Sequence, residues 1–95
     1  MVKTPQDILS QALIDAEDEI IFIFCQNHGG LEYAMPIVRK QFDDVGIDFR
    51  TPTAEGLRTV VKKLEEVSAS LKGAEFAKSE KQQFLRLISD AVKKG

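Results

Sequence analysis

The sequence predicts an all-α protein with the fold of an up-and-down four-helix bundle. Two observations support this fold class. Apolar residues recur at spacings of three and four through four successive segments, which is the period of a helix with one buried stripe. Glycine or proline residues separate the segments, so the connections between them are short. With 95 residues, 43% of them hydrophobic and 29% charged, the chain has the composition of one globular unit, and we expect residues 1–95 to form a single helical domain.

The first helix is predicted over residues 5–27. Thr4 can cap the free backbone N–H groups, and Pro5 suits the first helical position. Gly29 and Gly30 provide the left-handed conformation that ends helices. The predicted buried stripe consists of Leu9, Leu13, Ala16, Ile20 and Ile23.

Residues 20–25 leave an alternative open. Their β-branched and aromatic side chains favour a strand by propensity alone. The apolar stripe nevertheless passes through them without a change of phase, and no turn residue precedes them, so we favour the helix. The alternative is an α/β or α+β fold in which residues 20–25 form a strand.

The second helix is predicted from near Ala34 to Gly46. Pro36 fits a first turn but not a helix interior, so residues 27–33 are expected to form the connection. Residues 47–50 are expected to form a short extended link. The apolar stripe of this segment consists of Leu31, Met35, Val38, Phe42 and Val45.

The third helix is expected to begin with Thr51 as its cap and Pro52 in its first turn, and to end at Gly73. For the fourth, Ser79 and Gln82 form the pattern of a capping box, which predicts a start at Ser79. The expected buried residues of these two helices are Leu57, Val60, Leu64, Val67, Leu71, Phe84, Ile88 and Ala91.

The charges are balanced in total but unevenly distributed. The 13 Lys and Arg residues against 15 Asp and Glu residues leave a net charge of −2, which disfavours a generic polyanion binder. Residues 1–30 hold one basic and five acidic groups, whereas residues 53–95 hold nine basic and six acidic groups. The gradient favours contact between the acidic first helix and the basic end of the chain, within one molecule or between two copies.

Cysteine content and hydropathy predict a cytoplasmic protein without a membrane partner. Cys25 is the one cysteine, so neither an intramolecular disulfide nor a cysteine-rich zinc site can form. The longest apolar run, residues 20–25, is far shorter than the roughly 20 residues that span a bilayer. No signal peptide is recognisable in the first residues.

A protein–protein interaction or regulatory module, self-associating as a homodimer or binding another protein, is the function we predict. Residues 20–24 carry apolar side chains on every side of one helical turn, so part of this surface would face water in a small monomer. The predicted interface residues are Ile21, Phe22, Phe24 and Tyr33. No cofactor is expected.

A helix-turn-helix-like DNA-binding regulator is the first alternative. It would present Arg58, Lys62 and Lys63 to the major groove. Against it, the connection between Gly46 and Thr53 is longer than the usual turn of that motif.

A small enzyme or metal-binding protein centred on Cys25 and His28 is the second alternative. Thiolate and imidazole are competent metal ligands, and a cysteine beside a histidine base is a plausible nucleophile. The favoured interpretation is that Cys25 packs as a small apolar residue and that His28 is a polar residue at the helix end. We therefore predict neither catalytic residues nor a metal site, and we interpret the acidic residues Asp15, Glu17, Asp18 and Glu19 as a solvated helix face.

Overall fold

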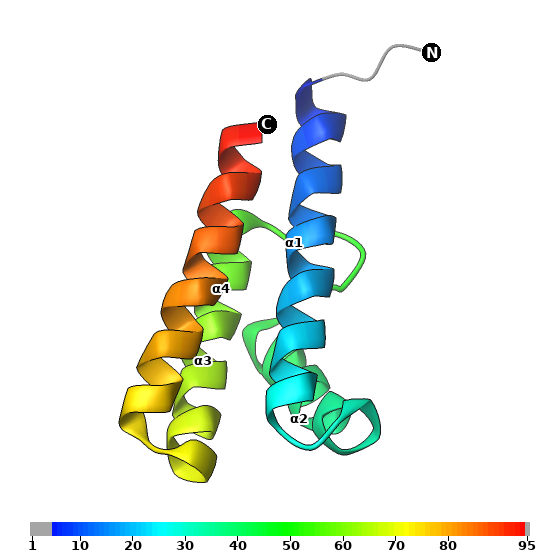
Figure 1. Cartoon of the computed structure of the whole chain (residues 1–95). Coiled ribbons are helices and arrows are strands. Elements are labelled where there is room, and N and C mark those ends of the chain that lie inside the picture. Colours follow the sequence, from blue (N-terminus) through cyan, green and yellow to red (C-terminus); the bar gives the residue numbers. More distant parts are fainter. Residues whose placement is uncertain (1–4, 95) are drawn as a thin grey trace.

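The computed structural model describes residues 5–94, which form four helices joined by short connections (Figure 1). The helices are α1 (Pro5–Asn27), α2 (Leu31–Val45), α3 (Ala54–Lys72) and α4 (Ala74–Lys94). Residues 5–94 contain no strand, which confirms the all-α prediction. The alternative of a strand at residues 20–25 is wrong, because this stretch lies inside α1 and its stripe packs into the helical core.

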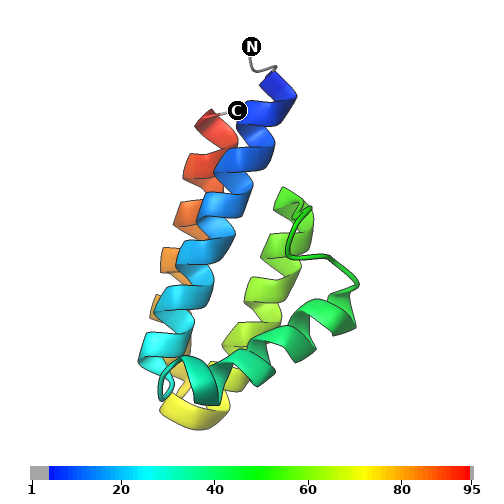
Figure 2. The same cartoon turned by 90° about the vertical axis from the view of Figure 1, so that its right-hand side faces the viewer.

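Successive helices run in opposite directions and form a ring (Figures 1 and 2). α4 packs against both α1 and α3, and α2 packs against both α1 and α3. The axes of α1, α3 and α4 are nearly aligned, whereas α2 crosses them at a steep inclination (Figure 2). The molecule measures 45 × 22 × 20 Å along its principal axes. None of the described helices combines the length and the apolar composition that a bilayer span requires.

One hydrophobic core lies along the axis of the ring. Three fully buried aromatic side chains, Phe24, Phe42 and Phe84, come from three different helices. The stripes predicted for α1, α3 and α4 supply most of the remaining core residues, as expected for amphipathic helices. They include Leu13, Ile20, Leu57, Val60, Leu64, Ile88 and Ala91.

α2 begins at Leu31, earlier than the predicted Ala34, so Pro36 lies within the helix. The amide of Ala34 donates to the carbonyl of Gly30 over 2.9 Å, which places residues 31–33 in the first turn. The bond that Pro36 cannot make would go to the carbonyl of Glu32, in an exposed first turn where water can replace it. The helix ends as predicted at Gly46, which adopts the left-handed conformation.

The starts of α3 and α4 also differ from the prediction. Thr53, not Thr51, caps α3, because its side chain accepts the hydrogen bond from the amide of Gly56 over 2.9 Å. α4 begins at Ala74 because Gly73 alone joins it to α3, so the predicted capping box at Ser79 lies in the helix interior. The predicted cap Thr4 lies outside the described residues.

Residues 47–50 were expected to be extended, but residues 49 and 50 form a turn, in which the amide of Thr51 donates to the carbonyl of Asp48 over 3.2 Å. Phe49 stacks on Phe42 with 4.4 Å between ring centroids and 27° between the ring planes, and this contact holds the link against the core.

We expect the Thr53→Ala protein to lose about 1 kcal/mol of unfolding free energy, because the first turn of α3 loses its side-chain cap. Urea denaturation measures this loss. Thr51→Ala, at an exposed position two residues earlier, is the matched control and should leave stability unchanged. Equal losses in the two variants would contradict Thr53 as the cap.

Candidate functional site

The α1–α2 and α3–α4 turns lie at the same end of the bundle, at the bottom of Figures 1 and 2. We call this region, residues 27–35 and 71–80, the turn end. Of the seven large hydrophobic residues that are exposed within residues 8–94, four belong to it. They are Leu31, Tyr33, Leu71 and Phe76.

Leu31 and Leu71 belong to the stripes that were expected to be buried, but they are 61% and 50% exposed. Their helices reach the end of the bundle, where no further element covers them. A shallow hollow of about 500 Å³ on α2 is lined by the apolar residues Leu31, Met35 and Pro36 and by the charged residues Glu32 and Arg39. Apolar surface of this kind is typical of interaction sites in small proteins.

The α1–α2 turn depends on its two glycines. Gly29 and Gly30 have φ angles of 99° and 97°, which confirms their predicted role as a helix stop. A Cβ atom on Gly29 would lie 3.2 Å from Cδ1 of Tyr33, so the tyrosine ring packs directly over this residue.

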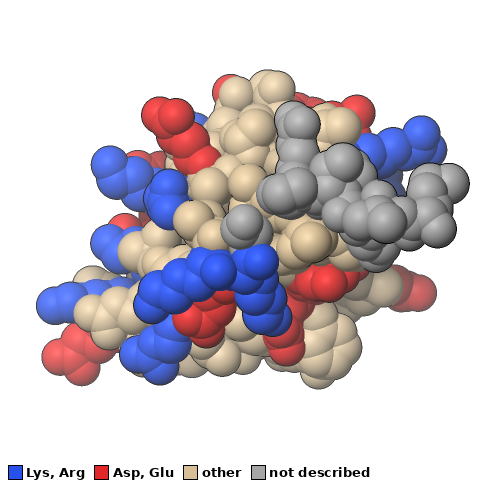
Figure 3. Space-filling view, turned by 90° about the horizontal axis from the view of Figure 1, so that it is seen from above, with Lys and Arg blue, Asp and Glu red and all other residues tan. Residues whose placement is uncertain are grey.

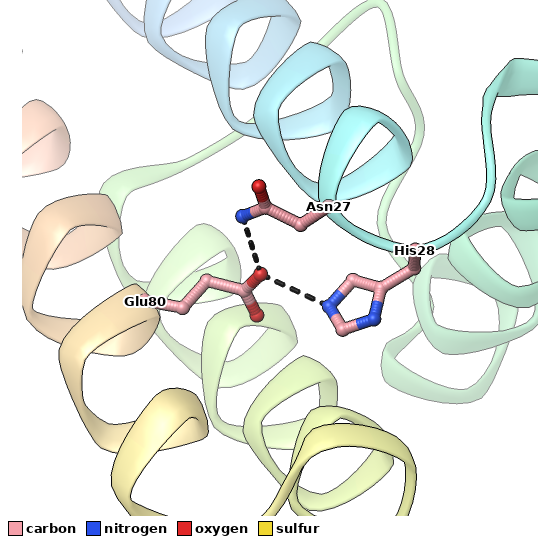
Figure 4. Close-up of polar contacts among 3 residues, drawn as sticks. All are labelled: Asn27, His28 and Glu80. Atoms are coloured by element: carbon pink, nitrogen blue, oxygen red, sulfur yellow. Dashed lines mark hydrogen bonds and ion pairs between the residues drawn. The ribbon is translucent and has the colours of Figure 1, made fainter.

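The turn end contains a polar cluster of Asn27, His28 and Glu80, in which His28 and Glu80 are buried and Asn27 is half-buried (Figure 4). Nε2 of His28 is 3.0 Å from Oε2 of Glu80, and Nδ2 of Asn27 donates to the same oxygen over 2.9 Å. The side chains of His28 and Glu80 are 0% and 2% exposed. The cluster therefore connects the end of α1 to α4 by polar contacts inside the bundle.

Aromatic rings surround His28. Its ring centroid is 4.2 Å from that of Phe24 and 5.9 Å from that of Phe76, which meets it edge-on. Nδ1 of His28 is buried and has no hydrogen-bond partner among the described residues. His28 directly follows the end of α1, as predicted, and its side chain is held in place by Glu80 and by the two rings.

Sequence reasoning missed Glu80 because it placed this residue in a capping box. One signal could have found it. Glu80 lies one turn before Phe84, in phase with the buried stripe of α4, where a carboxylate needs a polar partner.

Glu17 of α1 is a second buried carboxyl, so its assignment to a solvated helix face is wrong. It is 2% exposed, and its Oε2 has no hydrogen-bond partner among the described residues. Burial, with smaller effects from the negative charges of Asp18 and Asp48, raises the pKa of Glu17 from 4.5 to about 8. Asp15, Asp18 and Glu19 are exposed, as expected.

The predicted interface residues do not share one surface. Phe22 and Tyr33 are 61% and 65% exposed, whereas Ile21 is half-buried. Phe24 is fully buried in the core between α1 and its neighbours, so its assignment to an interface is wrong. Only Tyr33 belongs to the turn end.

Cys25 and His28 are not brought together as a reactive pair. Cys25 is buried as a small apolar residue, and burial raises the pKa of its thiol. The side chain of His28 contacts Glu80 instead. Among the side chains described for residues 8–94, no three or more of His, Cys, Asp or Glu are placed to hold a metal ion.

The three basic residues of the DNA-binding alternative do not all line the same hollow. Arg58 and Lys62 line a hollow of about 290 Å³ with Lys81 of α4, but Lys63 is not part of it. An ion pair of 3.1 Å joins Lys81 to Glu65, which offsets part of the positive charge. At the end of the bundle opposite the turn end, where α1 begins and α4 ends, basic and acidic side chains are interspersed (Figure 3).

Comparison with known proteins gives no relative for this chain: no protein-family model, no characterised protein and no solved structure matches it. Its residues are therefore interpreted from their own geometry and chemistry.

The stability of the protein should depend on pH through Glu17. Between pH 4.5 and 8 the unfolded chain releases this proton while the folded chain retains it, so unfolding free energy falls as the pH rises. The slope from this one group is at most about 1.4 kcal/mol per pH unit, and Glu17→Gln should remove it. Urea denaturation at several pH values measures the difference.

Glu19→Gln is the matched control for this experiment, since it removes one carboxyl from an exposed position on the same helix. If the two variants keep the same pH dependence as the parent protein, Glu17 does not retain its proton in the folded state.

Proposed function

We propose that this chain is a small helical protein–protein interaction module that associates with a second copy of itself through the turn end. The observation that carries the proposal is that Leu31, Tyr33, Leu71 and Phe76 are all exposed and belong to the two turns at one end of the bundle. Exposed apolar side chains that gather in one region favour docking, because their burial removes apolar surface from water.

The charges around this surface support a second copy as the partner. The exposed charged residues of the turn end are two acidic and two basic: Glu32, Glu75, Lys72 and Lys78. A balanced surface does not repel its own copy, and in a two-fold arrangement each basic group can face an acidic group of the other molecule.

The size of the turn end predicts a weak and reversible association. The bundle measures 22 × 20 Å across its long axis. This cross-section is smaller than the roughly 800 Å² per partner that standard interfaces bury. We therefore expect a dissociation constant on the order of 100 µM.

Sedimentation velocity between about 10 µM and 1 mM tests self-association, since this range brackets the expected dissociation constant. The mean mass of the parent protein should rise with concentration. The double variant Leu31→Ser, Leu71→Ser should remain a monomer, because it removes one exposed apolar side chain from each of the two turns that form the proposed contact.

The control is Ile8→Ser with Val92→Ser, which removes two exposed apolar residues from the opposite end of the bundle and should associate like the parent. Phe22→Glu changes an exposed residue of α1 outside the turn end, so it tests whether the outer face of α1 takes part in the association. A parent protein that stays monomeric at all concentrations, or a Leu31, Leu71 variant that associates normally, would refute the proposal.

DNA binding is the alternative function, supported by the hollow that Arg58, Lys62 and Lys81 line. Phosphate contacts are independent of sequence and strongest at low salt, so binding to a random duplex at about 50 mM salt tests it. The alternative predicts binding that weakens sharply by about 200 mM salt and that is lost in Arg58→Gln, Lys62→Gln. No binding at the lower salt concentration removes it.

A further inference from the structure

A hollow of about 220 Å³ lies between α1 and α4 at the edge of the turn end. It is lined by Asn27, Phe76, Ser79, Glu80 and Gln83. We infer that this hollow binds a primary ammonium group carried on an apolar stem. This inference goes beyond the proposed function, because it concerns a ligand site on this chain and not self-association.

The buried carboxylate of Glu80 is the first argument. Its side chain is 2% exposed and yet lines the hollow. The hydrogen bonds that join it to Asn27 and His28 both involve Oε2 (Figure 4). Neither of them involves Oε1. Oε1 is absent from the fully buried atoms that lack a partner, so it keeps contact with solvent at the hollow and can accept a further hydrogen bond. A charge-assisted bond from a cation is the strongest kind that a carboxylate oxygen accepts.

The other groups around the hollow favour the same ligand. An ammonium group carries three N–H donors and no acceptor. The carboxylate of Glu80, the hydroxyl of Ser79 and the side-chain amide of Gln83 all offer oxygen acceptors. A guanidinium fits less well, since its planar fork prefers two free carboxylate oxygens and Oε2 already accepts two hydrogen bonds.

Phe76 supplies the wall for the apolar stem. It is 39% exposed, and its ring already attracts one cation, because Nζ of Lys72 lies 5.9 Å from the ring centroid. Lys72 is not among the residues that line the hollow, so it does not occupy the site.

Two sources could supply this chemistry: a free alkylamine and the lysine side chain of a protein. n-Butylammonium is the probe for the first and Nα-acetyl-lysine N-methylamide for the second. 1-Butanol, which has the same stem and no charge, is the control ligand.

Titration of the full chain, labelled with ¹⁵N, measures binding by NMR. We expect saturable shifts of the Asn27 side-chain amide and of residues around Glu80, with a dissociation constant of about 1–10 mM for so small a ligand. Binding of n-butylammonium alone identifies a free amine as the ligand type. If the lysine derivative binds as strongly as n-butylammonium or more strongly, a lysine side chain of a protein is the ligand type. Either result supports the site.

Glu80→Gln removes the charge and should weaken binding at least about tenfold. Because this change also alters the buried contact with His28, a second variant leaves Glu80 intact. Ser79→Leu places a bulky side chain at the hollow and should block binding, whereas Ser89→Leu, exposed on the same helix, is the matched control and should bind normally.

The inference is overturned if neither amine gives saturable shifts up to about 100 mM, a concentration well above the expected dissociation constant. It is also overturned if 1-butanol gives the same shifts, or if Ser79→Leu binds like the parent. Self-association is measured without any amine, so failure of one proposal leaves the other to be decided by its own experiment.

Discussion

The arrangement at the turn end depends on the one-residue connection between α3 and α4. Gly73 has a φ of 94°; its amide donates to Ala69, and its carbonyl accepts from Ala77, so it ends one helix and starts the next. α4 must therefore run back directly beside α3. The helical phase that begins at Ala74 brings Glu80 and Phe84 onto one buried face, and it brings Phe76 beside His28.

The two buried carboxyls show how differently one bundle accommodates the same group. Glu80 receives hydrogen bonds from Asn27 and His28, so its burial also links α1 to α4. Glu17 lies in an equivalent stripe position on α1, but the described residues offer no partner to its Oε2. Burial without a partner favours the neutral acid, and this is the physical reason that the pKa of Glu17 is raised.

The candidate binding features share one end of the molecule. The apolar stripes of α2 and α3 continue to Leu31 and Leu71, beyond the part of the core that other helices cover. The hollow beside Glu80 lies at the edge of the same end. An apolar surface next to an oxygen-lined hollow can bury apolar groups of a partner and recognise a cation, a combination that gives interfaces both affinity and selectivity.

Much of the fold was predictable from local patterns. The extent of α1, the stops at Gly46 and Gly73 and most core residues follow from helical periodicity and from the conformational freedom of glycine, which involve neighbours three or four positions apart. The site was less predictable. Periodicity shows which residues share a helix face, but only the packing of other helices decides whether that face is covered. For this reason tertiary structure alone exposes Leu31 and Leu71, buries Phe24 and Glu17, and brings His28 to Glu80 across 52 positions of sequence.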